Sequence, residues 1–361
     1  RLSLVGSEMC IRDRSDEGRT WVATGTVQDT SDPDDELSYS IVSFQDEAGN
    51  SGTSLPTSIE YGGSDPIVID TIAPVITSVS ASLSKSDTTN TYLNQNRAEP
   101  GDTITLTIEA NEPLDYLEET DVSMSGTRVS ISSVTESDEG RTWVATGTVQ
   151  DTSDSDEELS YSIVSFQDEA GNSGTPPTVS IDYGGPDSDP IVIDTIAPVI
   201  TSVSASLSKS DSGMYLNQNR AEPGDTITLT IEANEPLDYL EETDVSMSGT
   251  RVSISSVTES DEGRTWVATG TVQDTSDSDE ELSYSIVSFQ DEAGNSGTPP
   301  TVSIEYGGPN PSDPIVIDTI APVITSLSAS LSKSDSGMYL NQKRAEPGDT
   351  ITLTIEANEP L

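Results

Sequence analysis

Hydrophobic and polar residues alternate with a period of two along several segments of the chain. The clearest case is residues 103–110, where Ile104, Leu106, Ile108 and Ala110 alternate with polar residues. This period is typical of a β-strand with one buried face and one solvent-facing side. We therefore predict a strand over residues 103–110 whose four apolar side chains point into a core.

Further segments are expected to be strands because they are rich in β-branched and aromatic residues. They are residues 129–134, 142–149, 159–166, 178–183 and 191–194. Turns rich in Gly, Pro, Asn, Asp and Ser separate them. Residues 114–120 suggest a single helical turn, and Trp143, with its equivalents Trp21 and Trp266, is expected in the core. Six or seven strands and no segment with a helical period predict an all-β sandwich or small barrel.

An internal repeat organises the chain. The sequence EGRTWVATG occurs at residues 17–25, 139–147 and 262–270, and IVIDTIAP begins at Ile67, Ile191 and Ile315. Copies start 122 to 124 residues apart (17 to 139, and 191 to 315). They differ in length at only two places, which we expect to be surface loops. One follows Lys85, and the other lies between Gly52 and Pro66 and in the equivalent stretches of the later copies.

The repeat also predicts the domain organisation. Residues 1–14 do not match the corresponding stretch of the next copy, and they resemble a translated sequencing adapter, so we set them apart as non-native. Because both ends of the chain interrupt a copy, we expect further domains outside it. The predicted pieces are the end of a truncated copy (15–70), two complete copies (71–194 and 195–318) and the start of another (319–361).

Composition narrows the range of functions. The chain has 361 residues, of which 64 are acidic and 15 basic, with one Cys and no His, and its formal net charge is −49. Nucleic acids and anionic membranes require a basic face, so we expect no nucleic-acid partner and no direct membrane contact. The lack of His excludes His-based catalysis and His-ligated zinc. An active site is normally built once, whereas the acids here recur in every copy, so we expect no enzyme.

Two short motifs recur at fixed spacing. The turn Asp-x-Ala-Gly-Asn begins at Asp46, Asp168 and Asp291, and the linker Asp-Thr-Ile-Ala-Pro begins at Asp70, Asp194 and Asp318. Together these motifs resemble the bacterial Ig-like tandem repeats of large cell-surface adhesins. The resemblance implies tandem Ig-like β-sandwich domains in a linear array, located extracellularly or at the cell surface. The copies are longer than the usual unit of that family, so an extra hairpin or long loop is expected near Tyr-Gly-Gly.

In the resembled family, the aspartates of the turn and of the linker ligate calcium between domains. We carry this role, with structural Ca²⁺ as the cofactor, onto Asp46, Asp70, Asp168, Asp194, Asp291 and Asp318. If the unit is Ig-like, the loop containing Glu112 lies at the same joint, as does the acidic run 29–36 of the preceding copy. Carboxylate and carbonyl oxygens are what calcium prefers. Glu112 and its equivalent Glu235 are therefore added on topological grounds.

The same motifs also have explanations without a metal ion. Asp-x-Ala-Gly-Asn is a good turn in itself, because Gly and Asn tolerate positive φ, and proline alone stiffens a linker. The run 151–158 lacks the central Gly of an EF-hand loop and is equally well explained as a solvated acidic loop.

The expected function is a non-catalytic stalk of a secreted or surface adhesin-like protein, with calcium stiffening its joints. The expected partners are neighbouring repeats and, through other domains, a surface glycan or protein. One alternative is that the repeats themselves bind glycan, ice or protein, for example through the Thr103, Thr105 and Thr107 row. Others are an ion-unspecific acidic spacer in a larger extracellular enzyme and a surface adapted to high salt.

Overall fold

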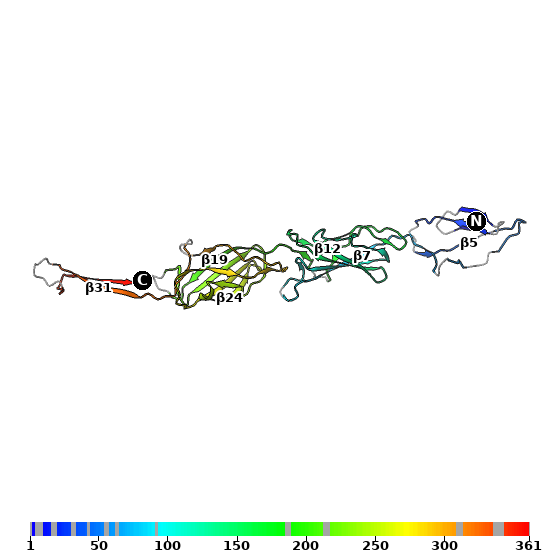
Figure 1. Ribbon diagram of the computed structural model, residues 1–361. Coiled ribbons are helices and arrows are strands. Elements are labelled where there is room, and N and C mark those ends of the chain that lie inside the picture. Colours follow the sequence, from blue (N-terminus) through cyan, green and yellow to red (C-terminus); the bar gives the residue numbers. More distant parts are fainter. Residues whose placement is uncertain are drawn as a thin grey trace. The chain divides into compact units, whose positions relative to one another are not determined.

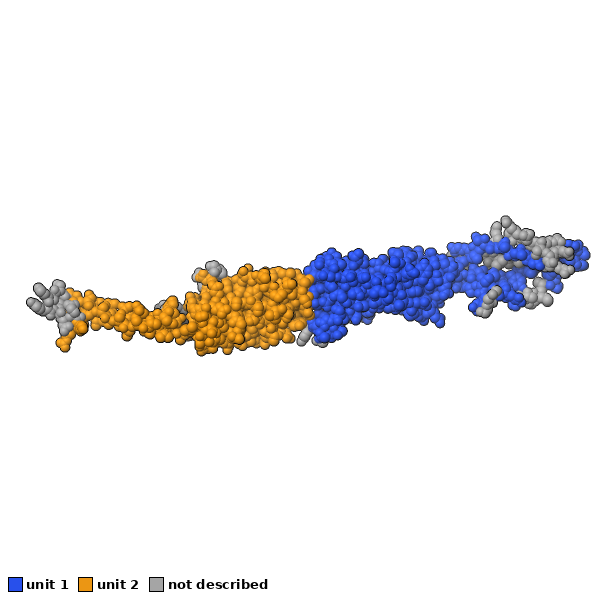
Figure 2. All heavy atoms as spheres, viewed as in Figure 1, with its two compact units in different colours: residues 1–196, 293–295 blue, residues 197–292, 296–361 orange. Residues whose placement is uncertain are grey.

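The chain forms two compact units in the computed structural model. Unit 1 comprises residues 1–196 and 293–295, and unit 2 comprises residues 197–292 and 296–361 (Figure 2). The structure describes residues 2–3, 10–15, 20–29, 34–41, 44–53, 58–61, 65–90, 93–184, 189–211, 217–307, 313–334 and 343–360. Within these residues no helix is long and apolar enough to span a membrane.

A five-stranded sheet forms one layer of the complete repeat in unit 1 (Figure 1). Its order is β12-β13-β9-β7-β17, and all neighbours are antiparallel except β17, which is parallel to β7. The strands are β7 (Ile76–Ser84), β9 (Thr103–Ala110), β12 (Val129–Ser137), β13 (Thr142–Val149) and β17 (Ile181–Asp182). β9 coincides with the predicted strand and buries Ile104, Leu106 and Ile108 completely, which confirms the prediction of one buried face.

Shorter pairs of strands form the opposite layer. They are β8 (Arg97–Ala98), β10 (Leu114–Tyr116), β11 (Val122–Met124), β14 (Glu157–Glu158), β15 (Tyr161–Ile163), β16 (Gln167–Asp168) and β18 (Val192–Ile193). β10 pairs with β16 and β11 with β15, while β18 lies between β14 and β8. Met124, Ile163 and Ile193 face the first layer within a single hydrophobic cluster. The result is the predicted all-β sandwich.

Unit 2 repeats this architecture. Its five-stranded sheet has the order β24-β25-β21-β19-β29, and β30 lies between β20 and β26. The strands are β19 (Ile200–Ser208), β20 (Arg220–Ala221), β21 (Thr226–Ala233), β22 (Leu237–Tyr239), β23 (Val245–Met247), β24 (Val252–Ser260), β25 (Thr265–Val272), β26 (Glu280–Glu281), β27 (Tyr284–Ile286), β28 (Gln290–Asp291), β29 (Ile304–Tyr306) and β30 (Val316–Ile317), with a 3₁₀ turn at Gly249–Arg251.

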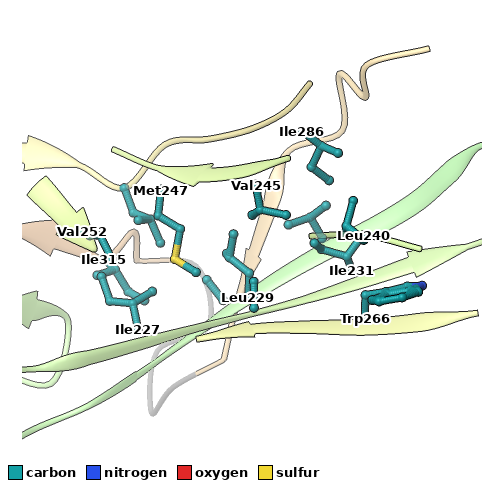
Figure 3. Packing of buried hydrophobic residues seen from close by; sticks show 14 of the residues in the cluster. Ile227, Leu229, Ile231, Leu240, Val245, Met247, Val252, Trp266, Ile286 and Ile315 are labelled. Carbon is teal, nitrogen blue, oxygen red and sulfur yellow. The ribbon is translucent and has the colours of Figure 1, made fainter. Parts of the chain in front are cut away.

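The core of unit 2 is filled from both layers. Figure 3 shows Ile227, Leu229 and Ile231 of β21 pointing toward Val245 and Met247 of β23. The Trp266 side chain also lies in this cluster, and its Nε1 donates a hydrogen bond to the Gly263 carbonyl at 2.9 Å. Trp266 and its equivalent Trp143 therefore lie in the core, as predicted, whereas Trp21 is 61% exposed, so the prediction was wrong for the first copy.

One expectation about local structure was wrong, and one long strand was not predicted. Residues 114–116 form strand β10 rather than a helical turn, because Leu114 pairs with Asp168 of β16 and is buried in the sandwich. Strand β7 was not among the predicted strands, although its residues 79–84 alternate with a period of two, and a bulge interrupts the pairing only between Ile76 and Ser78.

Outside the two complete repeats the strands form isolated pairs. β1 (Leu2–Ser3) pairs with β5 (Ser40–Ile41), β2 (Cys10–Ser15) with β3 (Thr20–Thr24), β4 (Asp35–Glu36) with β6 (Val68–Ile69), and β31 (Ile324–Ser332) with β32 (Thr350–Ala357). Residues 1–14, which do not match the repeat, thus still supply β1 and most of β2. Much of the two length-variable loops lies outside the described residues, including 54–57, 185–188 and 308–312.

A buried ion pair anchors the start of the third strand of each sandwich. In unit 2, Lys209 Nζ donates to Asp225 Oδ2 at 2.6 Å, and both side chains are almost inaccessible to solvent. Asp225 also accepts hydrogen bonds from the backbone N–H groups of Ser210 and Glu222. Lys85 and Asp102 form the same pair in unit 1. Because all of these groups are paired, the charges are tolerated inside the sandwich.

Candidate metal centre

Three carboxylates from different segments of unit 1 lie close together. Asp70 begins the linker after β6, Glu112 lies in the loop before β10, and Asp168 ends β16. One carboxylate oxygen of each lies within 4.8 Å of the others. The pairing of Leu114 with Asp168 explains how the loop containing Glu112 reaches the turn. Asp168 is fully buried, whereas Asp70 and Glu112 are partly buried.

The Asp168 turn also holds the linker through Asn172. The backbone N–H and the Nδ2 of Asn172 each donate to Asp168 at 2.8 Å, which closes the turn. Gly171 has a φ of +93°, a conformation that favours glycine at this position of the motif. Asn172 Nδ2 also donates to Asp70 Oδ1 at 3.2 Å. A single asparagine thus connects the two motifs that recur along the chain.

Electrostatic repulsion is concentrated at this cluster. Burial, followed by the charges of Asp168 and Asp34, raises the pKa of Asp70. Burial also raises the pKa of Glu112, and Asp70, Asp168 and Asp34 add to the effect. Asp34 comes from the acidic run of the preceding copy. Among the described residues no Lys or Arg forms an ion pair with Asp70, Glu112 or Asp168, so a cation bound here would relieve repulsion among four carboxylates.

The remaining predicted ligands occupy equivalent positions in their own repeats. Asp291 ends β28, pairs with Leu237 of β22 and is buried, and Glu235 lies in the loop before β22, where it accepts a hydrogen bond from Asn234 Nδ2 at 3.0 Å. Asp46 lies in an exposed turn of the same type, with Asn50 donating to both of its carboxylate oxygens. Asp46 is not brought together with other acids into a cluster within the described residues.

The linker aspartates of the complete repeats are fixed through their backbones. The N–H of Asp194 donates to the Ala98 carbonyl at 2.9 Å, and the N–H of Asp318 donates to the Ala221 carbonyl at 2.8 Å. The Asp194 side chain is completely buried, and this burial raises its pKa although Arg97 donates a hydrogen bond to it. Asp194 belongs to unit 1, and Asp318 belongs to unit 2.

Sequence reasoning did not identify the arginines that contact these linkers. Arg97 donates to Asp194, and Arg220 donates to Asp318. The available signal was the recurrence of Arg-Ala-Glu-Pro-Gly-Asp in every copy, beginning at Arg97, Arg220 and Arg344. This recurring motif does not indicate which residues the arginines contact, because their acidic partners lie about 60 and 100 residues further along the chain.

The acidic run 151–158 is folded back onto a buried arginine. Arg128 donates to the carbonyl of Ser155 at 2.8 Å and to that of Asp154 at 3.0 Å, and Glu157 lies 3.4 Å away. Arg251 holds the equivalent loop of unit 2 through the Ser278 carbonyl at 2.7 Å. The backbone carbonyls in these loops are therefore occupied by guanidinium groups, which differs from the ligand arrangement of an EF-hand loop.

Comparison with known proteins agrees with this architecture. The family model of the bacterial Ig-like domain matches residues 84–184 and 210–307, which together are just over half of the chain. No curated protein matches the chain. Each match covers most of one of the two complete sandwiches, and the all-β fold repeats with the period found in the sequence. The chain therefore belongs to the bacterial Ig-like domain family.

Proposed function

We propose that the chain is a non-catalytic stalk segment of a secreted or cell-surface adhesin-like protein, in which calcium stiffens the joints between repeats. Bacterial Ig-like domains commonly occur in surface and extracellular proteins and are typically structural, which supports the stalk role. Adhesion to a surface glycan or protein belongs in this proposal to other domains, which the stalk holds at a distance. The observation that carries the calcium part is the convergence of Asp70, Glu112 and Asp168.

The donors of this cluster suit calcium. The donors are all oxygens, and Ca²⁺ takes six to eight oxygen ligands in flexible geometry. Two of the three carboxylates belong to the sandwich that follows the linker, and the third belongs to the linker itself. An ion bound to all three fixes the linker to that sandwich. Rotation of the Asn172 amide would present its oxygen as a further ligand.

The proposed mechanism is mechanical. A short proline-containing linker bends easily unless its two ends are tied to folded neighbours. With calcium bound, residues 70–74 lose their freedom, and repulsion between the linker and the Glu112 loop is neutralised. Each joint then transmits orientation from one repeat to the next, so the array behaves as a rod whose stiffness resides in its joints.

Thermal melting and small-angle scattering of the full chain test the proposal. The conditions are EDTA, a few millimolar CaCl₂, and NaCl matched for ionic strength. An ion that binds only the folded form raises the melting temperature by mass action. We expect this rise, with an increase in particle length, only in calcium. Asp70→Asn and Asp168→Asn should reduce it, whereas Asp211→Asn, an exposed acid of unit 2, should not.

An equal response to NaCl would contradict the proposal. The acids would then act as a generic charged surface, which is the ion-unspecific spacer considered from the sequence.

A further inference from the structure

One arginine in the first complete repeat lies between two aspartates that are far apart in sequence. Arg97 of β8 donates through Nη2 to Asp194 Oδ2 at 2.8 Å, and the same nitrogen contacts Asp156 of the acidic run. The Asp194 side chain has no exposed surface, whereas Asp156 is exposed. The guanidinium therefore connects the linker with the loop that precedes β14.

Unit 2 has the same arrangement. Arg220 of β20 donates to Asp318 Oδ2 through Nε at 3.1 Å and through Nη2 at 2.9 Å, and its Nη2 also contacts Asp279. Asp279 is the equivalent of Asp156, and Asp318 is the equivalent of Asp194. The bridge thus forms separately in each unit, from residues belonging to that unit alone.

Both ends of the bridge in unit 1 are themselves anchored. On the linker side, the N–H of Val192 donates to the Asn96 carbonyl at 2.8 Å, and β18 pairs with both β14 and β8. On the loop side, buried Arg128 holds the carbonyls of Asp154 and Ser155. Arg97 is therefore placed between two carboxylates whose backbones are already fixed.

We propose that Arg97 and Arg220 are positioning residues, which act as built-in counter-ions that keep each linker aspartate docked on its own repeat without a metal ion. This inference rests on the proposed function, in which calcium ties the linker to the repeat that follows. According to this inference, two separate contacts hold each linker, one with the preceding repeat and one with the following repeat. The contact with the preceding repeat is independent of metal, whereas calcium strengthens the contact with the following repeat.

The chemistry of the guanidinium supports this division. Arginine stays protonated at all physiological pH values, and its planar group can serve two carboxylates at once. A buried aspartate without a partner would be strongly unfavourable. At Asp194, Arg97 occupies Oδ2, while Oδ1 accepts the Ile196 N–H at 3.3 Å. The linker carboxylate is thus already oriented before any ion arrives.

Hydrogen exchange of the full chain in EDTA, read by mass spectrometry, tests the inference. The reporters are peptides that contain the N–H groups of Val192 and Asp194, and of Val316 and Asp318. In the wild type we expect these groups to be protected in EDTA. Arg97→Gln should make exchange at 192–194 about tenfold faster or more, and Arg220→Gln should do the same at 316–318.

The third copy offers a matched control. Arg344 occurs in the same sequence context but is exposed, and it forms no ion pair within the described residues, so Arg344→Gln should leave both linkers unchanged. Arg97→Lys, which keeps the charge, should restore part of the protection at 192–194. Asp156→Asn, at an exposed position, should give a smaller increase in exchange without threatening the fold.

Protection at 192–194 and 316–318 that is unchanged in Arg97→Gln and Arg220→Gln would overturn the inference. Faster exchange throughout the sandwich, including β9 and β21, would also overturn it, because the arginines would then be general stabilising residues. Since the measurement is made in EDTA, it is separate from the calcium proposal. A chain whose melting temperature ignores calcium, but whose linkers depend on Arg97 and Arg220, contradicts only the proposed function.

Discussion

The octapeptide TITLTIEA occurs three times in the chain and has two different environments. In β9 and β21 its Ile and Leu side chains are completely buried, whereas in β32 Ile351, Leu353 and Ile355 are more than half exposed. All three copies nevertheless form a strand over the same eight residues, paired with the equivalent neighbour β7, β19 or β31. Strand formation here follows from the local pattern and the preceding strand. Burial requires the second layer of the sandwich.

Tryptophan shows the same contrast. Trp143 is 6% exposed, and its Nε1 donates to the Gly140 carbonyl at 3.0 Å, whereas Trp21, in the identical sequence EGRTWVATG, is 61% exposed. The difference teaches that equal sequences in this chain do not contribute equally to stability. Substitutions at equivalent positions of the complete repeats and of the outer copies (residues 15–70 and 319–361) therefore provide matched comparisons.

The largest loss of stability is expected from a substitution in the buried ion pair of Lys209 and Asp225. Asp225→Ala leaves the Lys209 ammonium with only the exposed Glu222 carboxylate at 3.5 Å and leaves two backbone N–H groups without their acceptor. The free energy of unfolding of unit 2 should therefore fall by about 3–5 kcal/mol. Native-state hydrogen exchange of β21 in urea measures the loss. Asp211→Ala removes an exposed acid of the same unit as the control, and an equal loss there would refute the argument from burial.

A core truncation sharpens the comparison between the environments. Leu106→Ala in β9 should lower the free energy of unfolding of its sandwich by about 2–5 kcal/mol, because it leaves a cavity in a filled core. The equivalent Leu353→Ala in β32 removes a side chain that is 55% exposed, and the expected change is within about 0.5 kcal/mol. Similar losses at both positions would mean that β32 is covered in solution.

A smaller loss of stability is expected from adding a side chain where β13 passes close to β12. A Cβ at Gly147 would lie 2.6 Å from Val129 Cγ1 and 3.1 Å from the Ser130 carbonyl oxygen. Gly147→Ala should therefore cost about 1–3 kcal/mol through overpacking. Gly25→Ala, at the equivalent exposed position, should cost less, and hydrogen exchange of β13 and β3 compares the two.

Acid should weaken unit 2 gradually through the same ion pair. Burial alone would raise the pKa of Asp225, but the hydrogen bonds from Lys209, Ser210 and Glu222 outweigh it and hold the pKa below its ordinary value. The stabilisation is therefore fully present above the unfolded pKa of about 3.9 and is lost as the pH falls through the folded pKa. Thermal melting between pH 7 and pH 2 should show this loss, and Asp225→Ala should make the decline shallower. An unchanged pH profile in the variant would assign acid sensitivity to other groups.

The sequence was sufficient for the fold class, because the strands that carry the core keep an uninterrupted period of two. Residues 103–110 and 142–149 have the predicted bounds. β7 was not predicted although its residues 79–84 alternate with a period of two. β10 was not predicted because the LDYLEET segment shows no alternation that would outweigh its helical spacing. Residues 159–166 and 178–183 are mostly loop, and their strands cover only Tyr161–Ile163 and Ile181–Asp182.

The candidate site was predictable only in part. The recurring motifs pointed to Asp70 and Asp168, and topology pointed to Glu112, and the structure places these three together. That they bind calcium stays a prediction. Arg97 could not be assigned from the sequence, since its contacts with Asp156 and Asp194 depend on tertiary packing across long stretches of chain. Local periodicity carries no information about such pairs.

Calcium titration of the full chain by isothermal calorimetry is the most direct test of the central claim. At constant ionic strength, we expect saturable heat from calcium binding, with a stoichiometry that falls by one site in the Asp70→Asn, Glu112→Gln, Asp168→Asn variant. Asp211→Asn should bind like the wild type. Absence of saturable binding, or the same stoichiometry in the triple variant, would contradict the claim that these three carboxylates form a calcium centre.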